Sequence, residues 1–449
     1  MMDTTRPDSL TPAPHPWLTG IPANWRSGPL KRFITSMDSG VSVNAFDIPA
    51  EAGQLGVLKT SCVYSGRFDA SQNKTVVEHE RDLVACPVRV GALIVSRMNT
   101  PDLVGAAGLV QEAAPNLFLP DRLWQVTFHG LLPRFAHYWT QSGLYRASVN
   151  AACAGTSASM QNLSQDDFRG FPLAAPDWQT QVLLADFLDS ETARIDALIE
   201  KKTHFIELLR EKRQALITQA VARGLDPGAP MKDSGVKWLG LVPAHWTLKP
   251  LKLLVKPGSS VTYGIVQPGD SLDEGIPFVQ TTNISRGDFD LNNLQRTTPE
   301  IEAMYPRSRL NGGEVILGIR ASIGAAFVVP EHLKGANLSR GIARIDCNAM
   351  LTPSYLMQYL RSQAAAAYWE LSRQGSTFNE VSIETVRGLP VLVPPLAEQA
   401  AITDFLAQST TRINRLTAAS VRSKHLLSER RAALITAAVT GQIDVREAA

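Results

Sequence analysis

A histidine flanked by two glutamates is the arrangement in this chain that most resembles an acid–base site. His79 lies between Glu78 and Glu80, and imidazole and carboxylate groups can exchange protons with a substrate near neutral pH. No nucleophile or metal-binding motif accompanies these residues. A solvated, charged surface therefore explains them better than a catalytic site does.

The common catalytic signatures are absent from the sequence. It contains neither the G-x-x-x-x-G-K-[ST] phosphate-binding loop nor the H-E-x-x-H zinc motif. The glycine-bounded segment Gly318–Gly324 fits no phosphate-binding pattern and indicates a turn between strands. Val393–Leu396 lacks the flanking residues of the Asp/Asn-Pro-Pro-aromatic motif of amino-methyltransferases. We therefore expect no catalytic activity from this chain alone.

Composition indicates a globular protein with no strong charge. Hydrophobic residues make up 44% of the 449 residues, and 44 Lys and Arg against 42 Asp and Glu give a net charge of +2. A surface for nucleic acid would therefore have to be local, or shared with a partner. The start of the chain has no signal-peptide pattern. Four separated cysteines indicate reduced thiols in a cytoplasmic protein: Cys62, Cys86, Cys153 and Cys347.

The sequence contains a long internal repeat. Trp17–Trp25 recurs as Trp238–Trp246, 221 positions later, and Glu211–Val221 recurs as Glu429–Val439, 218 positions later. Solenoid repeats are only 20–50 residues long, so a period of this length means that a whole domain with its connector was duplicated. The copies agree best at their ends and least in the middle, which predicts two similar scaffolds with different surfaces.

The first part of each copy has the pattern of a mixed α/β domain. Short apolar runs bounded by glycine indicate strands, polar Gly/Asn/Asp segments indicate turns, and an early proline indicates a helix start. The predicted elements are strands at Ala92–Ser96 and Val315–Ile319, turns at Ser285–Asp288 and Asn311–Gly313, and helices that begin near Pro133 and Pro353.

The last part of each copy predicts one long helix, at about 178–223 and 396–441, without proline or interior glycine. Apolar residues recur there at heptad spacings and predict a seam through which the two helices pair as an antiparallel coiled coil. A generic coiled coil that sets no distance remains an alternative. The predicted seam consists of Leu188, Ile195, Leu198, Phe205, Leu209 and Leu216 in the first helix, and of Leu406, Ile413, Leu416, Leu427 and Leu434 in the second.

These motifs together resemble one family, the specificity (S) subunits of Type I restriction–modification systems. The resemblance rests on Trp238–Trp246, on Gly312–Gly324 with Asn337–Arg340, on Leu389–Ile402 and on Leu434–Ile443. It covers nearly the whole chain. The first copy departs from the pattern, because Thr180 stands in place of a glutamate and three extra residues precede Gly105. These departures leave the DNA-contacting loops of the first domain in doubt, but not its fold.

The resemblance implies a non-catalytic, DNA-binding protein of phage defence. It implies that each target recognition domain reads one half of a split site on double-stranded DNA. The helices are expected to set the gap and to dock two methyltransferase subunits, to which two restriction (translocase and nuclease) subunits attach. No cofactor or metal is expected on this chain, whereas S-adenosylmethionine, ATP and Mg are expected on the partner subunits. A coiled-coil interaction scaffold that does not read DNA directly remains the alternative.

The expected fold class is α+β, with two recognition domains in tandem duplication, each followed by a long helix. We expect a disordered lead at 1–16, a first recognition domain at 17–174, a first helix at 175–224, a linker at 225–237, a second recognition domain at 238–392, a second helix at 393–443 and a tail at 444–449.

Polar side chains that follow the predicted strands are candidates for contacting DNA, since such groups read base edges or hold phosphates. Loop solubility and turn formation remain the alternative explanation. Arg97 and Arg320 are aligned as equivalents, which favours a shared phosphate or scaffold role, whereas Gln280 differs from its counterpart Lys59. The candidates are Lys59, Thr60, Ser61, Arg67, Lys74, Arg97 and Asn99 in the first domain, and Gln280, Thr281, Thr282, Asn283, Arg286, Arg320, Ser322, Asn337 and Arg340 in the second.

Overall fold

The computed structural model describes residues 10–11, 21–153, 159–373 and 380–443, and the chain forms two compact units. Unit 1 comprises Met1–Thr203 and Arg422–Ala449, and unit 2 comprises His204–Val421. Most of the predicted lead, the first four residues of the first tryptophan motif and the predicted tail lie outside the described residues. Two residues of the lead, Leu10–Thr11, form strand β1, which pairs with β2 (Ile21–Pro22).

Unit 1 contains two four-stranded sheets, in the orders β10–β8–β12–β4 and β11–β6–β7–β5. The central strand β8 is buried throughout, as a continuous apolar run requires. Its Leu93 and Val95 face one core and its Ile94 faces another, so both sides of the first sheet are covered. The strands are β4 (Ile34–Ser39), β5 (Ala45–Phe46), β6 (Gly56–Leu58), β7 (Asn73–Val76), β8 (Leu93–Ser96), β10 (Ala107–Leu109), β11 (Leu117–Phe118) and β12 (Leu123–Phe128).

Three short helices and two strand pairs complete the recognition part of unit 1. The helices supply an aromatic cluster in which Trp139 and Tyr145 meet edge to face at 4.9 Å and Phe168 contacts Phe171. The elements are α1 (Pro133–Thr140), α2 (Gly143–Ala152) and α3 (Gln165–Gly170), with β3 (Arg26–Pro29) paired to β14 (Pro172–Ala175) and β9 (Met98–Asn99) paired to β13 (Gln161–Asn162).

Unit 2 repeats this plan with smaller sheets, in the orders β18–β24–β21–β22 and β20–β19–β23. In β21, Val315 and Leu317 face one core and Ile316 faces the other, as in β8. The strands are β18 (Thr262–Tyr263), β19 (Ile276–Val279), β20 (Gln295–Thr297), β21 (Val315–Gly318), β22 (Ala326–Val328), β23 (Asn337–Leu338) and β24 (Ile342–Ile345), with the pairs β15 (Met231–Asp233) and β16 (Leu241–Pro243), and β17 (Thr247–Pro250) and β25 (Pro390–Val393).

The helices of unit 2 correct one sequence-based prediction. Ser285–Asp288 was expected to be a turn, but Ser285 and Arg286 end a helix, and Gly287 caps it at a positive φ of 65°. The predicted helix start at Pro353 is confirmed, as is the one at Pro133. The helices are α5 (Thr281–Arg286), α6 (Pro299–Ala303), α7 (Pro353–Leu360), α8 (Gln363–Arg373) and α9 (Ile383–Gly388).

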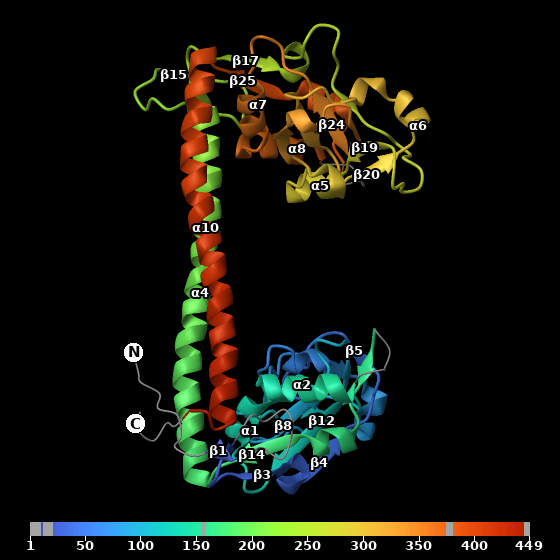
Figure 1. The fold of residues 1–449 in the computed structure, drawn as a ribbon, viewed down its shortest axis with the longest axis vertical. Helices are drawn as coiled ribbons and strands as arrows, with labels where there is room; N and C mark the ends of the chain where they lie inside the picture. The colour runs from blue at the N-terminus through green and yellow to red at the C-terminus, as the bar shows by residue number, and fades with distance from the viewer. Residues whose placement is uncertain (1–9, 12–20, 154–158, 374–379, 444–449) are drawn as a thin grey trace. The chain divides into compact units, whose positions relative to one another are not determined.

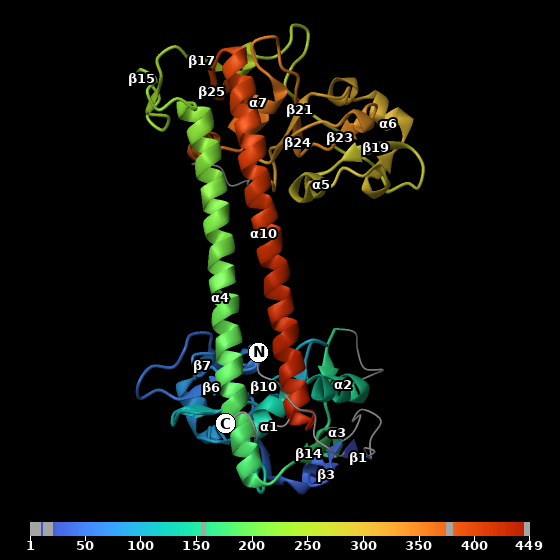
Figure 2. The same cartoon turned by 60° about the vertical axis from the view of Figure 1, so that its left-hand side comes forward.

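Two long helices, α4 (Trp178–Arg223) and α10 (Leu396–Val439), confirm the long helices expected from the sequence. Within unit 1, the first part of α4 lies beside the last part of α10 (Figures 1 and 2). There Arg431 of α10 donates through Nε to Asp196 of α4 at 2.9 Å.

The same backbone contacts join the elements in both units. Leu30 N donates to Phe171 O at 2.8 Å, and Leu251 N donates to Leu389 O at 2.9 Å. Each contact places the strand pair at the start of the recognition part next to the strand that leads into a long helix. The mixed α/β plan and the long helices expected from the sequence are therefore present in the structure.

Candidate nucleic-acid interface

A buried glutamine fixes each recognition part to the start of its long helix. Gln181 Oε1 accepts from Leu132 N at 2.7 Å, while Nε2 donates to the carbonyls of Gly130 and Pro176. Gln399 is bound in the same way, since Oε1 accepts from Thr352 N at 2.8 Å. The sequence analysis quoted both glutamines but gave them no role.

The polar candidates of unit 1 form two small groups. Lys59 Nζ lies 2.6 Å and Lys74 Nζ 3.7 Å from the same Asp47 oxygen. The pKa of Asp47 is lowered, first by the hydrogen bond from Lys59 and then by its charge. The two ammonium groups therefore share one carboxylate on an exposed surface, where displacement by a phosphate is sterically open.

The second group in unit 1 converges on a tyrosine. Thr60 Oγ1 lies 2.7 Å from the Tyr64 hydroxyl, and Asn99 Nδ2 donates to the same hydroxyl at 2.8 Å. Asn99 is only 7% exposed, so its assignment to DNA contact is corrected to a scaffold role. Ser61 donates to Gln72 at 2.9 Å.

The structure corrects the pairing of Arg97 with Arg320. Arg97 N donates to Arg122 O and Ile319 N to Gly341 O, so Arg97 occupies the place of Ile319, one residue earlier. Nε of Arg97 is buried and has no hydrogen-bond partner among the described residues. Its exposed neighbour Arg122 follows from this register and was missed by the sequence analysis.

Three segments of unit 2 bring most of its candidates together. Ser285 of α5 contacts Ser322, Ile319 N donates to Gly341 O at 2.9 Å, and the Thr281 side chain lies against Gly341. Helix α5, the turn at 319–322 and the turn at 339–341 thus form one surface, which we call the convergent surface.

Exposure separates the candidates on and around the convergent surface. Thr282, Arg286 and Arg340 are exposed, whereas Gln280 is half-buried and donates through Nε2 to Gln295 at 2.7 Å. Arg320 is held by Glu380, to which its Nε donates at 3.0 Å.

Two asparagines of unit 2 are corrected from DNA contact to scaffold. Asn337 is fully buried, since its Oδ1 accepts from Ser308 Oγ at 2.6 Å and its Nδ2 donates to Glu302 Oε1 at 3.1 Å. Asn283 is 9% exposed, and its Oδ1 accepts from Gln280 N at 2.9 Å. Both side chains spend their hydrogen-bonding capacity inside the protein.

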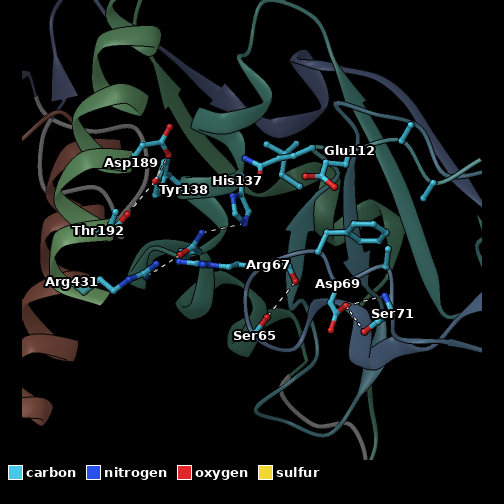
Figure 3. A pocket seen from close by; sticks show the side chains of 18 residues that line it. Ser65, Arg67, Asp69, Ser71, Glu112, His137, Tyr138, Asp189, Thr192 and Arg431 are labelled. Carbon is cyan, nitrogen blue, oxygen red and sulfur yellow. Dashed lines mark hydrogen bonds between the residues drawn. The ribbon is translucent and has the colours of Figure 1, made fainter. Parts of the chain in front are cut away.

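A cavity of about 660 Å³ in unit 1 lies between the loop at 65–71 and the two long helices (Figure 3). Acidic and basic side chains both line it, among them Asp189, Glu112 and Arg431. Tyr138 donates from its hydroxyl to Asp189 Oδ1 at 2.5 Å. The charges in this cavity therefore compensate one another within unit 1.

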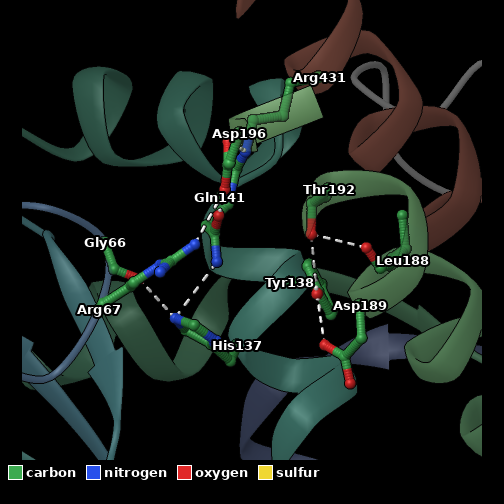
Figure 4. A network of polar contacts seen from close by, with 10 residues as sticks. All are labelled: Gly66, Arg67, His137, Tyr138, Gln141, Leu188, Asp189, Thr192, Asp196 and Arg431. Carbon is green, nitrogen blue, oxygen red and sulfur yellow. Dashed lines mark hydrogen bonds and ion pairs between the residues drawn. The ribbon is translucent and has the colours of Figure 1, made fainter. Parts of the chain in front are cut away.

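A network of polar contacts ties one wall of this cavity together (Figure 4). Asp196 accepts from Arg67 and from Arg431, each at 2.9 Å. His137 Nε2 lies 2.7 Å from Gly66 O, and burial lowers the pKa of His137. Arg67, a DNA-contact candidate, is thus paired with a helix carboxylate in this structure.

The buried stripe of the long helices differs from the predicted heptad seam. Leu188, Ile195, Leu209, Leu406 and Ile413 are buried, and Leu216, Leu427 and Leu434 are half-buried. Leu198, Phe205 and Leu416 are 40%, 41% and 42% exposed, so they are removed from the seam.

The residues buried instead are spaced by eleven. They are Leu184, Ile195, Ile206 and Ile217 in α4, and Ile402, Ile413 and Ile435 in α10, where the last two lie twice eleven apart. Eleven residues make almost three full turns of an α-helix, whereas a seven-residue repeat drifts around the helix by about 20° per repeat. The stripe therefore follows nearly straight helices.

Two further classes of site were examined over the described ranges. No group of three His, Cys, Asp or Glu residues there is arranged to hold a metal ion. Likewise, none of the helices in these ranges combines the length and the apolar character needed to span a membrane.

Comparison with known proteins gives one consistent family. A model described as "Type I restriction modification DNA specificity domain" matches residues 270–421. The "Type I restriction enzyme EcoBI specificity subunit" of Escherichia coli is 26% identical over 265 residues, 58% of this chain and 55% of that protein. The "Putative type I restriction enzyme MjaX specificity subunit" of Methanocaldococcus jannaschii is 19% identical over 435 residues, 95% of each. The chain thus spans about half of the first relative and nearly all of the second.

Solved structures share the fold. A structure described as "Structural basis underlying complex assembly and conformational transition of the type I R-M system" has a TM-score of 0.70 at 16% identity, covering 94% of this chain and 99% of that one. The "HsdS subunit from Thermoanaerobacter tengcongensis" has a TM-score of 0.52 at 16% identity, covering 94% and 98%. The resemblance to Type I specificity subunits, expected from the sequence, is confirmed.

Proposed function

We propose that this chain, as a protein similar to Type I specificity subunits, is the DNA-recognition subunit of a restriction–modification complex and catalyses no reaction itself. Each recognition domain reads one half of a bipartite site on double-stranded DNA. The observation that carries the proposal is that one scaffold, fixed by Gln181 in unit 1 and by Gln399 in unit 2, presents different exposed polar side chains.

We further propose that the chain is a tandem duplication whose long helices pair as an antiparallel coiled coil. Matching contacts support the duplication, since Gly143 N donates to Thr436 Oγ1 and Gln363 N to Thr218 Oγ1, both at 3.0 Å. The ion pair between Arg431 and Asp196 supports the pairing within unit 1. The domain boundaries expected from the sequence belong to this proposal.

The partners in this proposal are two methyltransferase subunits and two restriction subunits. S-adenosylmethionine, ATP and Mg bind those partners, because the reactions they serve need groups that this chain's sequence lacks. The long helices dock the methyltransferase subunits and set the gap between the half-sites. We place the complex in the cytoplasm, where chromosomal and invading DNA meet.

Lengthening both helices tests the proposal. An insertion of 22 residues, two of the eleven-residue periods, into both α4 and α10 keeps the buried stripe aligned and adds about 33 Å at 1.5 Å per residue. That length matches about one turn of duplex DNA, or roughly ten base pairs. We expect the tolerated gap to grow by about this amount, with both half-sites unchanged, in selection from randomised duplexes with the methyltransferase present.

The controls separate a ruler from a scaffold. The same insertion in one helix alone should abolish assembly, because the two stripes no longer match. A changed half-site preference with an unchanged gap would refute the ruler. Absence of any sequence selection by the unmodified complex would favour the interaction scaffold, and methyl transfer by this chain alone would overturn the non-catalytic role.

A further inference from the structure

Unit 2 contains a cavity lined by arginine on several sides. Its volume is about 550 Å³, and it lies between α4, α5 and the residues around β22. We call it the arginine pocket after Arg210, Arg213, Arg286 and Arg361. No aspartate or glutamate is among its lining residues. The pocket therefore concentrates positive charge without an acidic side chain on its wall.

The arginine pocket is already ordered without a ligand. Arg361 Nε donates to Ala326 O at 2.7 Å, and its guanidinium lies 4.4 Å from the centre of the Phe327 ring. Burial and the positive charge of Arg213 lower the pKa of Arg361 to about 10. Nε of Arg213 is buried without a hydrogen-bond partner in the described part of the chain.

The corresponding place in unit 1 contains its own anion. Arg431 occupies the position of Arg213 at the 218-residue spacing, and it is paired with Asp196. The residue that corresponds to Asp196 is Asn414, which carries no charge. The matching Thr436 and Thr218 contacts support this alignment. Unit 2 has thus kept the arginine and lost the internal carboxylate.

The nearest acidic residue in sequence does not replace it. Asp288 follows Gly287 of the pocket, but its carboxylate accepts from Asn293 Nδ2 at 2.9 Å and from Asp290 N at 3.2 Å. An anion for the arginine pocket must therefore come from another molecule. Guanidinium groups match phosphate oxygens in geometry and are weakly hydrated, which makes arginine well suited to phosphate.

We propose that the arginine pocket binds backbone phosphates of the DNA duplex. The proposal rests on the DNA-recognition function above. Arg286 links the two, because it is exposed on α5 beside Thr282 of the convergent surface and also lines the pocket. Phosphate contacts fix the register of a protein on DNA without reading its sequence. The pocket thus supplies affinity and position, while the convergent surface supplies sequence selection.

The experiment uses the full chain assembled with its methyltransferase partner and a fluorescent duplex that contains the methylated motif. Anisotropy titrations from 50 to 200 mM salt compare wild type with the double variant Arg213→Gln/Arg286→Gln. Each lost phosphate contact reduces the salt slope by about 0.9, so two contacts account for about a twelvefold smaller loss of affinity over this range. We expect that change on specific and non-specific duplexes alike.

Matched variants make the outcome decisive. Arg223→Gln removes an exposed charge at the end of α4, outside the pocket, and should leave the slope unchanged. Arg286→Lys keeps the charge and should restore most of the slope lost in Arg286→Gln. A double variant with the wild-type slope would overturn the phosphate site. Weaker assembly with the methyltransferase at unchanged DNA affinity would also overturn it, and would point to carboxylates of the partner instead. A wild-type complex without sequence preference would instead count against the proposed function.

Discussion

Replacing Gln399 with leucine tests how strongly a recognition domain is fixed to its helix. The side chain is fully buried. Its Oε1 accepts from Thr352 N and Oγ1, at 2.8 and 3.1 Å, and its Nε2 donates to Met350 O and Pro394 O, at 2.8 and 2.9 Å. Leucine has a similar volume, so the substitution removes the polar contacts with little change in shape.

The expected cost follows from these contacts. A typical hydrogen bond contributes about 1 kcal/mol net, and a buried donor or acceptor left unsatisfied costs about 1–3 kcal/mol. Gln399→Leu leaves one backbone N–H and two carbonyls without this partner, so we expect a loss of about 3–5 kcal/mol. Since 1.4 kcal/mol is a factor of ten, opening around Thr352 should become at least about a hundredfold more frequent.

Hydrogen exchange measured by mass spectrometry reports this opening locally. Peptides that cover α7 should exchange faster in Gln399→Leu, while peptides that cover α1 in unit 1 keep their wild-type rates. Gln181→Leu should give the reverse pattern, because Gln181 makes the matching contacts in unit 1. Gln408→Leu, at an exposed position of α10, controls for the change of residue type. Exchange in α7 within twofold of wild type would refute the reasoning.

Three further substitutions test other buried or paired groups. Asn337→Ala should destabilise unit 2 by about 3 kcal/mol in chemical denaturation, because four hydrogen bonds to its side chain are lost, while half-site preference is unchanged. His137→Gln should flatten the loss of stability on acidification: burial lowers the folded-state pKa below 6.5, so the histidine's share of stability is present above that pH and is lost as pH falls through it. Glu398→Ala should lower stability by about 1 kcal/mol, because the indole of Trp246 loses its acceptor at 2.9 Å, and a thermal melt would detect this.

Periodic patterns predicted the elements well but predicted the buried stripe of the long helices less well. The bounds of α4 follow from the absence of proline and glycine, and Gly441 at a φ of 73° lies just beyond α10. A heptad count places Phe205 in the seam, yet its neighbour Ile206 is the buried residue. Over one or two turns the two periods differ by only one residue, so spacing alone does not distinguish them.

Polar residues were harder to assign from sequence than apolar ones. Asn99, Asn283 and Asn337 follow strands just as Thr282 and Arg340 do, but they point inward. The direction depends on which carbonyls and hydroxyls lie nearby, and those come from distant parts of the chain. Ser308, for example, donates to Asn337 across 29 residues. A pattern read along the chain contains no such information.

The register error at Arg97 has a different origin. Aligning the two copies by residue type matched Arg97 with Arg320, because both follow an apolar strand by a short distance. The hydrogen bonds from Arg97 N and Ile319 N match the backbones instead, and they differ from the residue match by one position. Since alternate residues of a strand point to opposite faces, a slip of one changes which side chains a domain presents.

The departure at Thr180 shows how two copies can keep one fold with different chemistry. In unit 2, Glu398 accepts from the Trp246 indole and from His245 Nε2 at 2.7 Å. In unit 1, Thr180 donates through N and Oγ1 to Asp177, whose pKa these contacts lower, so the start of α4 is capped within its own turn. The helix start needs a satisfied end, not a particular residue. The doubt that Thr180 raised therefore concerns which tryptophan contact is retained, and the fold of the first copy does not depend on it.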